Sequence, residues 1–262
     1  MKAQVYKDPR PAEHFARFHE RVRTRKPDWV YGLVRAVLTP YLIVMHRARC
    51  IDSDMIPSEG PVIIAPNHFS FLDHFFVAAF IRREVQFMGK SQLFKPPMQF
   101  IFTHGGVFPV LRGRHDEDAF KTAHAVLARG GVVVMYAEGG RSRTGGLGEP
   151  RSGVGRLALE SGAAVVPTAI YGTQKARNWK RLQFPKVTVQ YGAPIAFERV
   201  EHPTREQAQA ASQIVFERIE ELYYGLQRGG RRSAVRASRA ARAARRAAER
   251  AAEGATRRPA TG

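Results

Sequence analysis

The sequence predicts an α/β fold in which a mostly parallel central sheet is flanked by helices. From residue 61 onward, short β-rich runs alternate with segments of helical periodicity. This alternation is typical of a largely parallel sheet that is covered by helices on both faces. An apolar fraction of 44% with 16 Phe residues is enough for a packed core, which excludes disorder throughout the chain.

The strands and helices of this domain are expected in a regular order. We expect strands at residues 61–66, 85–89, 106–111, 131–136, 164–170 and 186–191. We expect helices between them at residues 70–82, 92–103, 115–129 and 151–162. Ligands on such sheets sit at the carboxyl ends of the strands, so we look for functional side chains there.

The first 50 residues form a separate N-terminal region in this interpretation. Residues 1–28 are charged and carry three prolines, which favours an irregular or partly helical arm. Residues 29–45 have apolar side chains at helical spacing and basic residues on both sides. The segment is shorter than the roughly 20 apolar residues of a spanning helix. It is either an amphipathic helix in the headgroup plane of a membrane or a helix packed on the domain's own core.

The C-terminal region changes character after the last amphipathic helix, expected at residues 204–226. We assign residues 51–228 to the α/β domain and residues 229–262 to an Ala/Arg-rich tail. The part from Arg228 onward contains eleven Arg and two Glu, so about half of the net charge of +19 lies there. Such a tail cannot bury a core, and we expect it to be disordered, or helical on contact with an anionic surface.

Charge and cysteine content limit the class of protein further. A net charge of +19 calls for an anionic partner, either nucleic acid, lipid headgroups or an acidic substrate. No recognisable nucleic-acid motif accompanies the charge, so nucleic acid is not the expected partner. The single cysteine, Cys50, cannot form an internal disulfide or a thiolate zinc site, which favours an intracellular protein without a metal.

The sharpest candidate for chemistry directly follows the first strand, where Asn67, His68 and Asp73 occur. If Ser70 caps the next helix, Asp73 falls in its first turn while His68 stays outside it, and the two side chains can meet. A carboxylate fixes the imidazole tautomer, and the other ring nitrogen can then take a proton from a hydroxyl. The alternative is a structural His beside a capping Asp.

Three basic residues suited to an anionic group follow later in the chain, of which Arg112 is expected at a strand end and Arg141 in a glycine-rich loop. Arg112 and Arg141 can make bidentate contacts to a phosphate, and Lys90 can add a point charge. Glu138 lies among these cations and is interpreted as orienting an arginine, binding an acceptor hydroxyl or forming a structural ion pair. Each cation alone is equally explained as a solvated surface charge.

Four motifs in order resemble the PlsC-like glycerolipid acyltransferases, also called lysophosphatidic acid acyltransferases. That family carries Asn-His-x4-Asp, Gly-x-x-Phe-x-Val-x-Arg, Phe-Pro-Glu-Gly-Thr-Arg-Ser and a later Val-Pro segment. The matching segments here are Asn67, His68 and Asp73; residues 105–112 (GGVFPVLR); residues 136–142 (YAEGGRS); and Val165-Val166-Pro167. Residues 88–95 (MGKSQLFK) also look like the family's lysine-containing approach to the second motif. The third motif here has Ala137 and Gly140 in place of Pro and Thr.

The resemblance implies transfer of a fatty acyl group from acyl-CoA or acyl-carrier protein to the free hydroxyl of 1-acylglycerol-3-phosphate. Such a reaction needs no cofactor beyond this co-substrate. Its catalytic residues would be His68 as general base and Asp73 as its orienting carboxylate. The substrate-binding residues that the resemblance implies are Asn67, Lys90, Arg112, Glu138, Gly139, Arg141 and Ser142. The expected location is the cytoplasmic face of the cell membrane, as a peripheral or monotopic protein that binds the anionic surface.

Two alternatives remain open on the sequence. The changes at Ala137 and Gly140 allow the same chemistry on another lysophospholipid, a glycolipid or a polyol acceptor. The second alternative is a non-catalytic protein that binds an anionic surface or nucleic acid through its arginine-rich tail.

Overall fold

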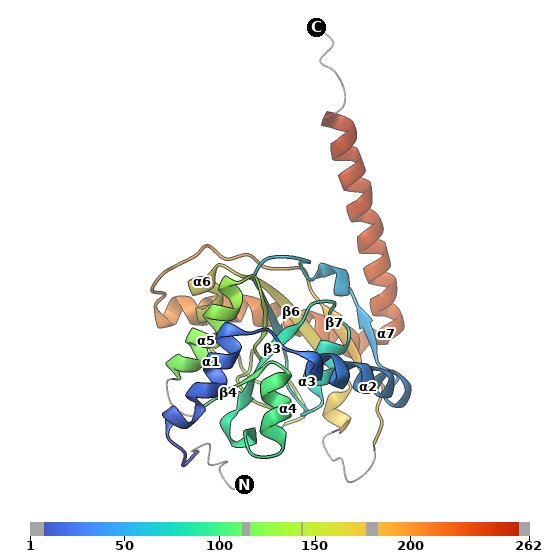
Figure 1. Cartoon of the computed structure of the whole chain (residues 1–262). Helices are drawn as coiled ribbons and strands as arrows, with labels where there is room; N and C mark the ends of the chain where they lie inside the picture. Colours follow the sequence, from blue (N-terminus) through green and yellow to red (C-terminus); the bar gives the residue numbers. More distant parts are fainter. Residues whose placement is uncertain (1–7, 112–115, 143, 177–182, 257–262) are drawn as a thin grey trace.

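A computed structural model describes residues 8–111, 116–142, 144–176 and 183–256 of the chain, and its centre is one seven-stranded sheet (Figure 1). The strand order is β1-β7-β6-β2-β5-β3-β4, and every neighbouring pair is parallel except β6 and β7. The strands are Arg49–Ile51 (β1), Val62–Pro66 (β2), Val85–Lys90 (β3), Val107–Val110 (β4), Val132–Val134 (β5), Ala164–Tyr171 (β6) and Thr188–Tyr191 (β7).

Helices cover both faces of this sheet, as the alternation along the sequence predicts. The α-helices are Ala16–Thr24 (α1), Trp29–Met45 (α2), Asp73–Ala79 (α3), Met98–His104 (α4), Glu117–Ala128 (α5), Gly153–Ser161 (α6) and Arg205–Thr256 (α7). On β2, Ile63 and Ala65 pack into the layer of α5, α6 and the first half of α7. Val62 and Ile64 point to the opposite face and pack with α2 and α3. The mostly parallel α/β fold is therefore confirmed.

Several boundaries differ from the sequence-based expectation. The short edge strand β1 was not predicted, because three residues that include an exposed arginine carry too little β pattern. Helix α4 begins at Met98 rather than at residue 92. The Pro96-Pro97 pair explains this shift, since the residue before a proline is disfavoured in a helix. Residues Ser91–Leu93 form a separate 3₁₀ turn instead.

Helix α2 spans the predicted residues and leaves most of its apolar side chains at the surface. Its first turn is capped by Asp28, whose carboxylate accepts a hydrogen bond from the backbone amide of Val30 at 3.1 Å. Val30, Tyr31 and Leu42 are buried against the domain. The outward-facing apolar residues of α2 are Trp29, Leu33, Val37, Tyr41, Ile43, Val44 and Met45, of which Val44 is 70% exposed. One edge of the helix therefore packs on the core, and the other apolar side chains of the helix remain exposed at the surface.

A test of length and hydropathy on the described residues finds no single helix that could cross a membrane. The helical segments Ala12–Thr24 and Trp29–Met45 reach the length and hydropathy of a membrane span only when they are taken together, and they are bent by 86° at their junction.

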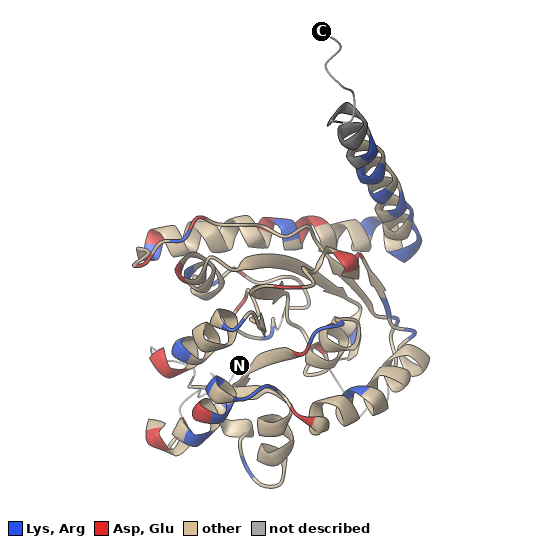
Figure 2. Cartoon of the chain, turned by 45° about the horizontal axis from the view of Figure 1, so that its top comes forward, with Lys and Arg blue, Asp and Glu red and all other residues tan. Residues whose placement is uncertain are grey.

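The C-terminal helix α7 is broken at Gly230, whose φ of 67° and ψ of 176° are not helical. Its first half packs on α6 and the sheet, and the second half projects away from the domain (Figure 1). Lys and Arg line the projecting part (Figure 2). Arg242 contacts Asp52 and Asp54, and Arg231 donates to the carbonyl of Val187 at 2.7 Å, so the base of this helix is attached to the domain.

The contact between α6 and α7 gives a stability prediction at Gly155. A Cβ built on Gly155 would overlap the carbonyl oxygen of Ala208 and lie 2.6 Å from the amide nitrogen of Ser212. Gly155→Ala should therefore lower the free energy of unfolding by about 1–3 kcal/mol, because the two helices must separate. The matched control is Gly225→Ala in α7, where nothing lies within 4 Å of the new methyl group. That control should raise stability by about 0.5–1 kcal/mol. Urea unfolding measures both, and a Gly155→Ala variant as stable as the control would contradict the packing.

Candidate active site

A buried His–Asp pair lies at the carboxyl end of β2. His68 follows the strand by two residues, and Asp73 is the first residue of α3. The imidazole Nδ1 lies 2.9 Å from Asp73 Oδ2, so the predicted contact across the strand-to-helix junction is present. The same oxygen accepts the backbone amides of Phe69 at 2.7 Å and Ser70 at 2.8 Å. Three donors thus converge on one carboxylate oxygen, which fixes the turn that carries His68.

The expected helix cap at Ser70 is wrong in detail. The residue at the cap position is Leu72, and no side chain caps α3. The Ser70 hydroxyl instead accepts the amide of Leu72 at 3.2 Å, one turn before the helix. Asp73 itself supplies the acceptor for the amides that precede α3, so the carboxylate stabilises both the turn and the imidazole.

The surroundings of His68 suit a general base. The ring is 4% exposed and stacks on Tyr136, with ring centroids 3.8 Å apart and planes inclined by 20°. A carboxylate can only accept, so Nδ1 carries the proton in this pair and Nε2 is the basic nitrogen. When Nε2 takes up a proton, the adjacent Asp73 stabilises the resulting imidazolium.

Asn67, which the resemblance implies to be substrate-binding, makes backbone contacts in the structure. Its amide oxygen accepts the backbone N–H of Ile170 at 2.7 Å, and its amide nitrogen donates to the Ile170 carbonyl at 3.1 Å. The side chain is fully buried between β2 and β6. These two bonds join the residue after β2 to β6, so Asn67 fixes the strand end directly before His68.

The carboxyl group of Glu138 is bonded to two backbone amides. One carboxylate oxygen accepts the backbone amide of His68 at 2.8 Å, and the other accepts that of Gly148 at 2.7 Å. The carboxyl group therefore ties the His68 turn to the following loop, in place of the predicted arginine or acceptor hydroxyl. Burial raises the pKa of Glu138 to about 7, against the effect of these two amide bonds, which lower it.

The loop after Glu138 supports the same turn. Gly139 has a φ of 64°, a left-handed conformation that favours glycine. The backbone amide of Ser142 donates to the carbonyl of His68 at 2.8 Å. Arg141, the residue before Ser142, is exposed to solvent. Gly139 and Ser142 thus shape the loop around His68, and Arg141 is the member of this group that is available to an anionic ligand.

Of the two other expected cations, the structure describes Lys90. Lys90 is the last residue of β3, which pairs in parallel with β4 and β5 and so ends at the same edge of the sheet as β2. Arg112 lies outside the described residues, directly after Leu111. In the part of the chain that the structure describes, no group of three or more His, Cys, Asp or Glu side chains is arranged to hold a metal ion.

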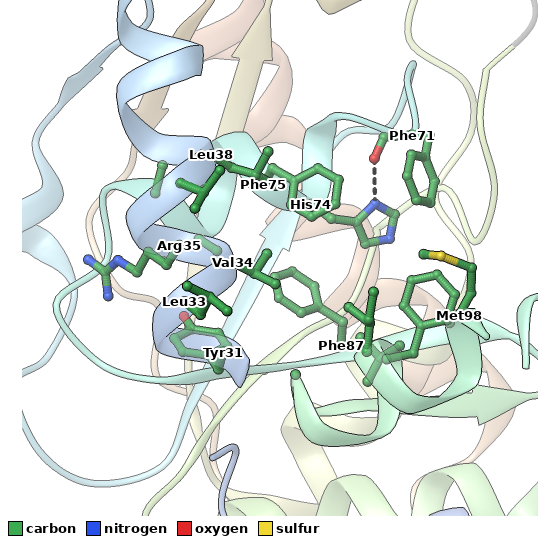
Figure 3. Close-up of a pocket in the computed structure, with 18 of the residues that line it drawn as sticks. Tyr31, Leu33, Val34, Arg35, Leu38, Phe71, His74, Phe75, Phe87 and Met98 are labelled. Atoms are coloured by element: carbon green, nitrogen blue, oxygen red, sulfur yellow. Dashed lines mark hydrogen bonds between the residues drawn. The ribbon is translucent and has the colours of Figure 1, made fainter. Parts of the chain in front are cut away.

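An apolar cavity of about 410 Å³ lies beside the His–Asp pair and was not expected from the sequence. Its walls come from α2, α3, α4 and β3, and its lining includes His74 of α3 (Figure 3). The ring centroid of His74 lies 5.3 Å from that of His68. Aliphatic and aromatic side chains make nearly all of the lining, including Val34, Leu38, Phe75 and Phe87. The sequence carries only a weak signal for it, because these residues look like ordinary core positions on separate elements.

A His–Asp pair at the carboxyl edge of a parallel sheet, next to an apolar cavity, defines a class of protein equipped for general-base chemistry beside a long apolar ligand. Residues 47–171 match the family model described as Acyltransferase. This segment contains the four motifs, so the match supports their resemblance to the PlsC-like glycerolipid acyltransferases.

Individual relatives agree with this assignment. The chain is 32% identical over 121 residues to a chloroplastic 1-acyl-sn-glycerol-3-phosphate acyltransferase of Arabidopsis thaliana and 31% identical over 121 residues to one of Brassica napus. Each match covers 45% of this chain and about a third of the relative, 34% and 35%. The crystal structure of the 1-acyl-sn-glycerophosphate acyltransferase PlsC from Thermotoga maritima has the same fold, with a TM-score of 0.54 and 20% identity over 80% of this chain and 88% of that one.

The raised pKa of Glu138 predicts a pH-dependent contribution to stability. The pKa of Glu138 is about 7 in the folded chain and near the ordinary glutamate value of 4.5 in the unfolded chain. The unfolded state therefore loses this proton first, and the free energy of unfolding falls as pH rises from about 4.5 to about 7. Glu138→Gln should remove this part of the slope in urea unfolding across that pH range. The control is Glu201→Gln, at an exposed residue, which should keep the wild-type slope. Equal slopes in all three proteins would contradict the burial of a titrating Glu138.

Proposed function

We propose that this chain is an O-acyltransferase that moves a fatty acyl group from acyl-CoA or acyl-carrier protein to the free hydroxyl of 1-acylglycerol-3-phosphate. The observation that carries the proposal is the His68–Asp73 pair, 2.9 Å apart, within the segment that matches the acyltransferase family model. His74, which is in ring contact with His68, lines an apolar cavity. The pair suits activation of a hydroxyl, and the cavity suits an acyl chain. The relatives that are named 1-acyl-sn-glycerol-3-phosphate acyltransferases support this acceptor.

The reaction needs one base and no covalent enzyme intermediate. His68 Nε2 takes the proton from the acceptor hydroxyl as its oxygen attacks the thioester carbonyl carbon. The resulting tetrahedral intermediate collapses, the carbon–sulfur bond breaks, and the protonated imidazole returns the proton to the leaving thiolate. Asp73 holds the Nδ1 proton throughout and stabilises the imidazolium between the two transfers. This mechanism uses the thioester of the co-substrate, the acceptor hydroxyl and side chains of the protein, so we propose no further cofactor.

We assign the acceptor phosphate to three basic residues of the predicted site. Lys90 at the end of β3, Arg112 and Arg141 are the candidates, with bidentate contact from an arginine. Asn67 and Glu138 are buried and bonded to backbone groups, so we assign them to the positioning of His68. Gly139 and Ser142 belong to the same supporting loop.

The exposed apolar residues of α2 give the enzyme a way to reach its lipid substrates. Two of them, Leu33 and Val37, also line the cavity that we assign to the acyl chain, and further exposed apolar residues lie on α4. The residues of α4 in this set are Met98, Phe100 and Ile101. Arg47 and Arg49 follow α2 and can contact anionic headgroups. We therefore propose a peripheral or monotopic protein on the cytoplasmic face of the cell membrane, with α2 lying in the interface.

A second acceptor class is favoured by a specific observation in the loop beside His68. Ala137 and Gly140 replace the Pro and Thr of the family's third motif, and this loop contacts the turn that carries His68. A different lysophospholipid, a glycolipid or a polyol ester is therefore the alternative acceptor. A panel of acceptors with one labelled acyl-CoA separates the two: the higher kcat/KM identifies the acceptor.

The central experiment is product analysis with labelled acyl-CoA and lysophosphatidic acid in detergent. The wild type should form the diacyl product, and His68→Ala should lower the rate by about 10²–10⁴-fold because the base is lost. The matched control is His202→Ala, at an exposed histidine, which should keep the wild-type rate. Circular dichroism checks that both variants fold. A folded His68→Ala variant with nearly full activity would contradict the proposed base.

Membrane docking by α2 predicts a loss of vesicle binding when its exposed face becomes charged. Val37 is 62% exposed and Val44 is 70% exposed, so glutamates at both positions should be tolerated by the fold. The Val37→Glu, Val44→Glu variant should sediment less with vesicles that contain anionic lipid, since both apolar contact and charge attraction weaken. Ile214→Glu in α7, at a side chain 47% exposed on the other side of the sheet, is the control and should bind as the wild type does. Equal losses in both variants would show that α2 is not the docking surface.

A further inference from the structure

His74 lies where the apolar cavity meets the His–Asp pair. It is the second residue of α3 and follows Asp73 directly. Its ring centroid is 5.3 Å from that of His68, with the planes 83° apart, and 5.0 Å from that of Tyr136. The same ring lines the cavity between Phe71, Phe75 and Met98 (Figure 3). The motif that carries the family resemblance ends at Asp73 and gives position 74 no role.

One contact of His74 defines the protons on its ring. Nδ1 lies 3.1 Å from the carbonyl oxygen of Phe71. A carbonyl oxygen only accepts, so Nδ1 carries a hydrogen and donates it. Nε2 is then an acceptor in the neutral ring and a second donor in the charged ring. The contact also fixes the orientation of the imidazole at the wall of the cavity.

The other polar residues of the cavity lie on a different wall. Tyr31, Arg35 and Thr39 all come from α2. Figure 3 shows Arg35 directed away from His74, on the far side of α2. Among the polar residues that line the cavity, His74 is therefore the one in ring contact with His68. An acyl chain in this cavity has its carbonyl carbon next to the hydroxyl that His68 activates, so its thioester group must pass beside His74.

We propose that His74 is part of the acyl-donor site, where its charged ring donates a hydrogen bond from Nε2 to the thioester carbonyl oxygen. This inference rests on the proposed acyl transfer. The donated bond holds the carbonyl at the end of the cavity beside His68. This hydrogen bond strengthens when the hydroxyl oxygen of the acyl acceptor attacks the carbonyl carbon, because negative charge then develops on the thioester carbonyl oxygen. His74 thus acts on the transition state of the acyl group, while His68 acts on the acceptor hydroxyl.

Two substitutions at His74, assayed with the full chain, separate this role from a structural one. His74→Phe keeps an aromatic ring at the cavity wall but removes the donor, and His74→Gln keeps a side-chain N–H donor. Both are assayed with lysophosphatidic acid and acyl-CoA donors of short, medium and long saturated chains. Leu38→Phe is the comparison variant, because Leu38 lines the cavity from α2 and its enlargement should shorten the space for the chain.

We expect His74→Phe to lower kcat by about 10²-fold with little change in KM, equally for every chain length. His74→Gln should recover most of that loss, and Leu38→Phe should reduce activity on long chains only. Thermal unfolding should show both His74 variants folded.

Three outcomes overturn the inference. They are a fully active His74→Phe variant, a loss that depends on chain length as in Leu38→Phe, and a loss that His74→Gln does not recover. A wild type that transfers no acyl group to any acceptor contradicts the proposed function itself, and this result is distinct from the other three.

Discussion

The carboxylate of Asp73 organises the turn on which the site depends. Its Oδ2 atom accepts hydrogen bonds from the imidazole of His68 and from the backbone amides of Phe69 and Ser70, with donor–acceptor distances of 2.7 to 2.9 Å. Hydrogen bonds to a charged, buried acceptor contribute more than neutral ones, about 1.5–3 kcal/mol each. One group therefore fixes the shape of the loop, the tautomer of the ring and the start of α3. Chemistry and local folding are coupled at this residue.

Two further residues brace the same turn from outside. Asn67 joins the end of β2 to Ile170 of β6, and Glu138 joins the amide of His68 to that of Gly148. Both side chains are buried and hold backbone groups, so they transmit the rigidity of the sheet to the imidazole. In the proposed function, a base held in this way needs little reorganisation during proton transfer, which is the physical advantage of placing it at a strand end.

The apolar cavity and the exposed face of α2 both result from the partial packing of this helix on the domain. Helix α2 buries Val30, Tyr31 and Leu42 on the domain and leaves Ile43 and Val44 outside. A helix that packed fully would fill the space between α2, α3 and α4. Partial packing instead leaves a cavity of about 410 Å³, and His74 in its lining is in ring contact with His68. The same helix thus serves a lipid chain on one side and a lipid surface on the other in the proposed function.

The sequence by itself determined the layered fold, the extent of α2 and the contact between His68 and Asp73. These follow from local periodicity and from short spacing along the chain, both of which are fixed by backbone geometry. It did not determine the partners of Glu138 or the place of His74. Glu138 meets an amide 70 residues away, and His74 faces a cavity built from elements far apart in the chain. Such contacts arise only when the sheet and its helices assemble, because they depend on which distant surfaces pack together and not on any local pattern.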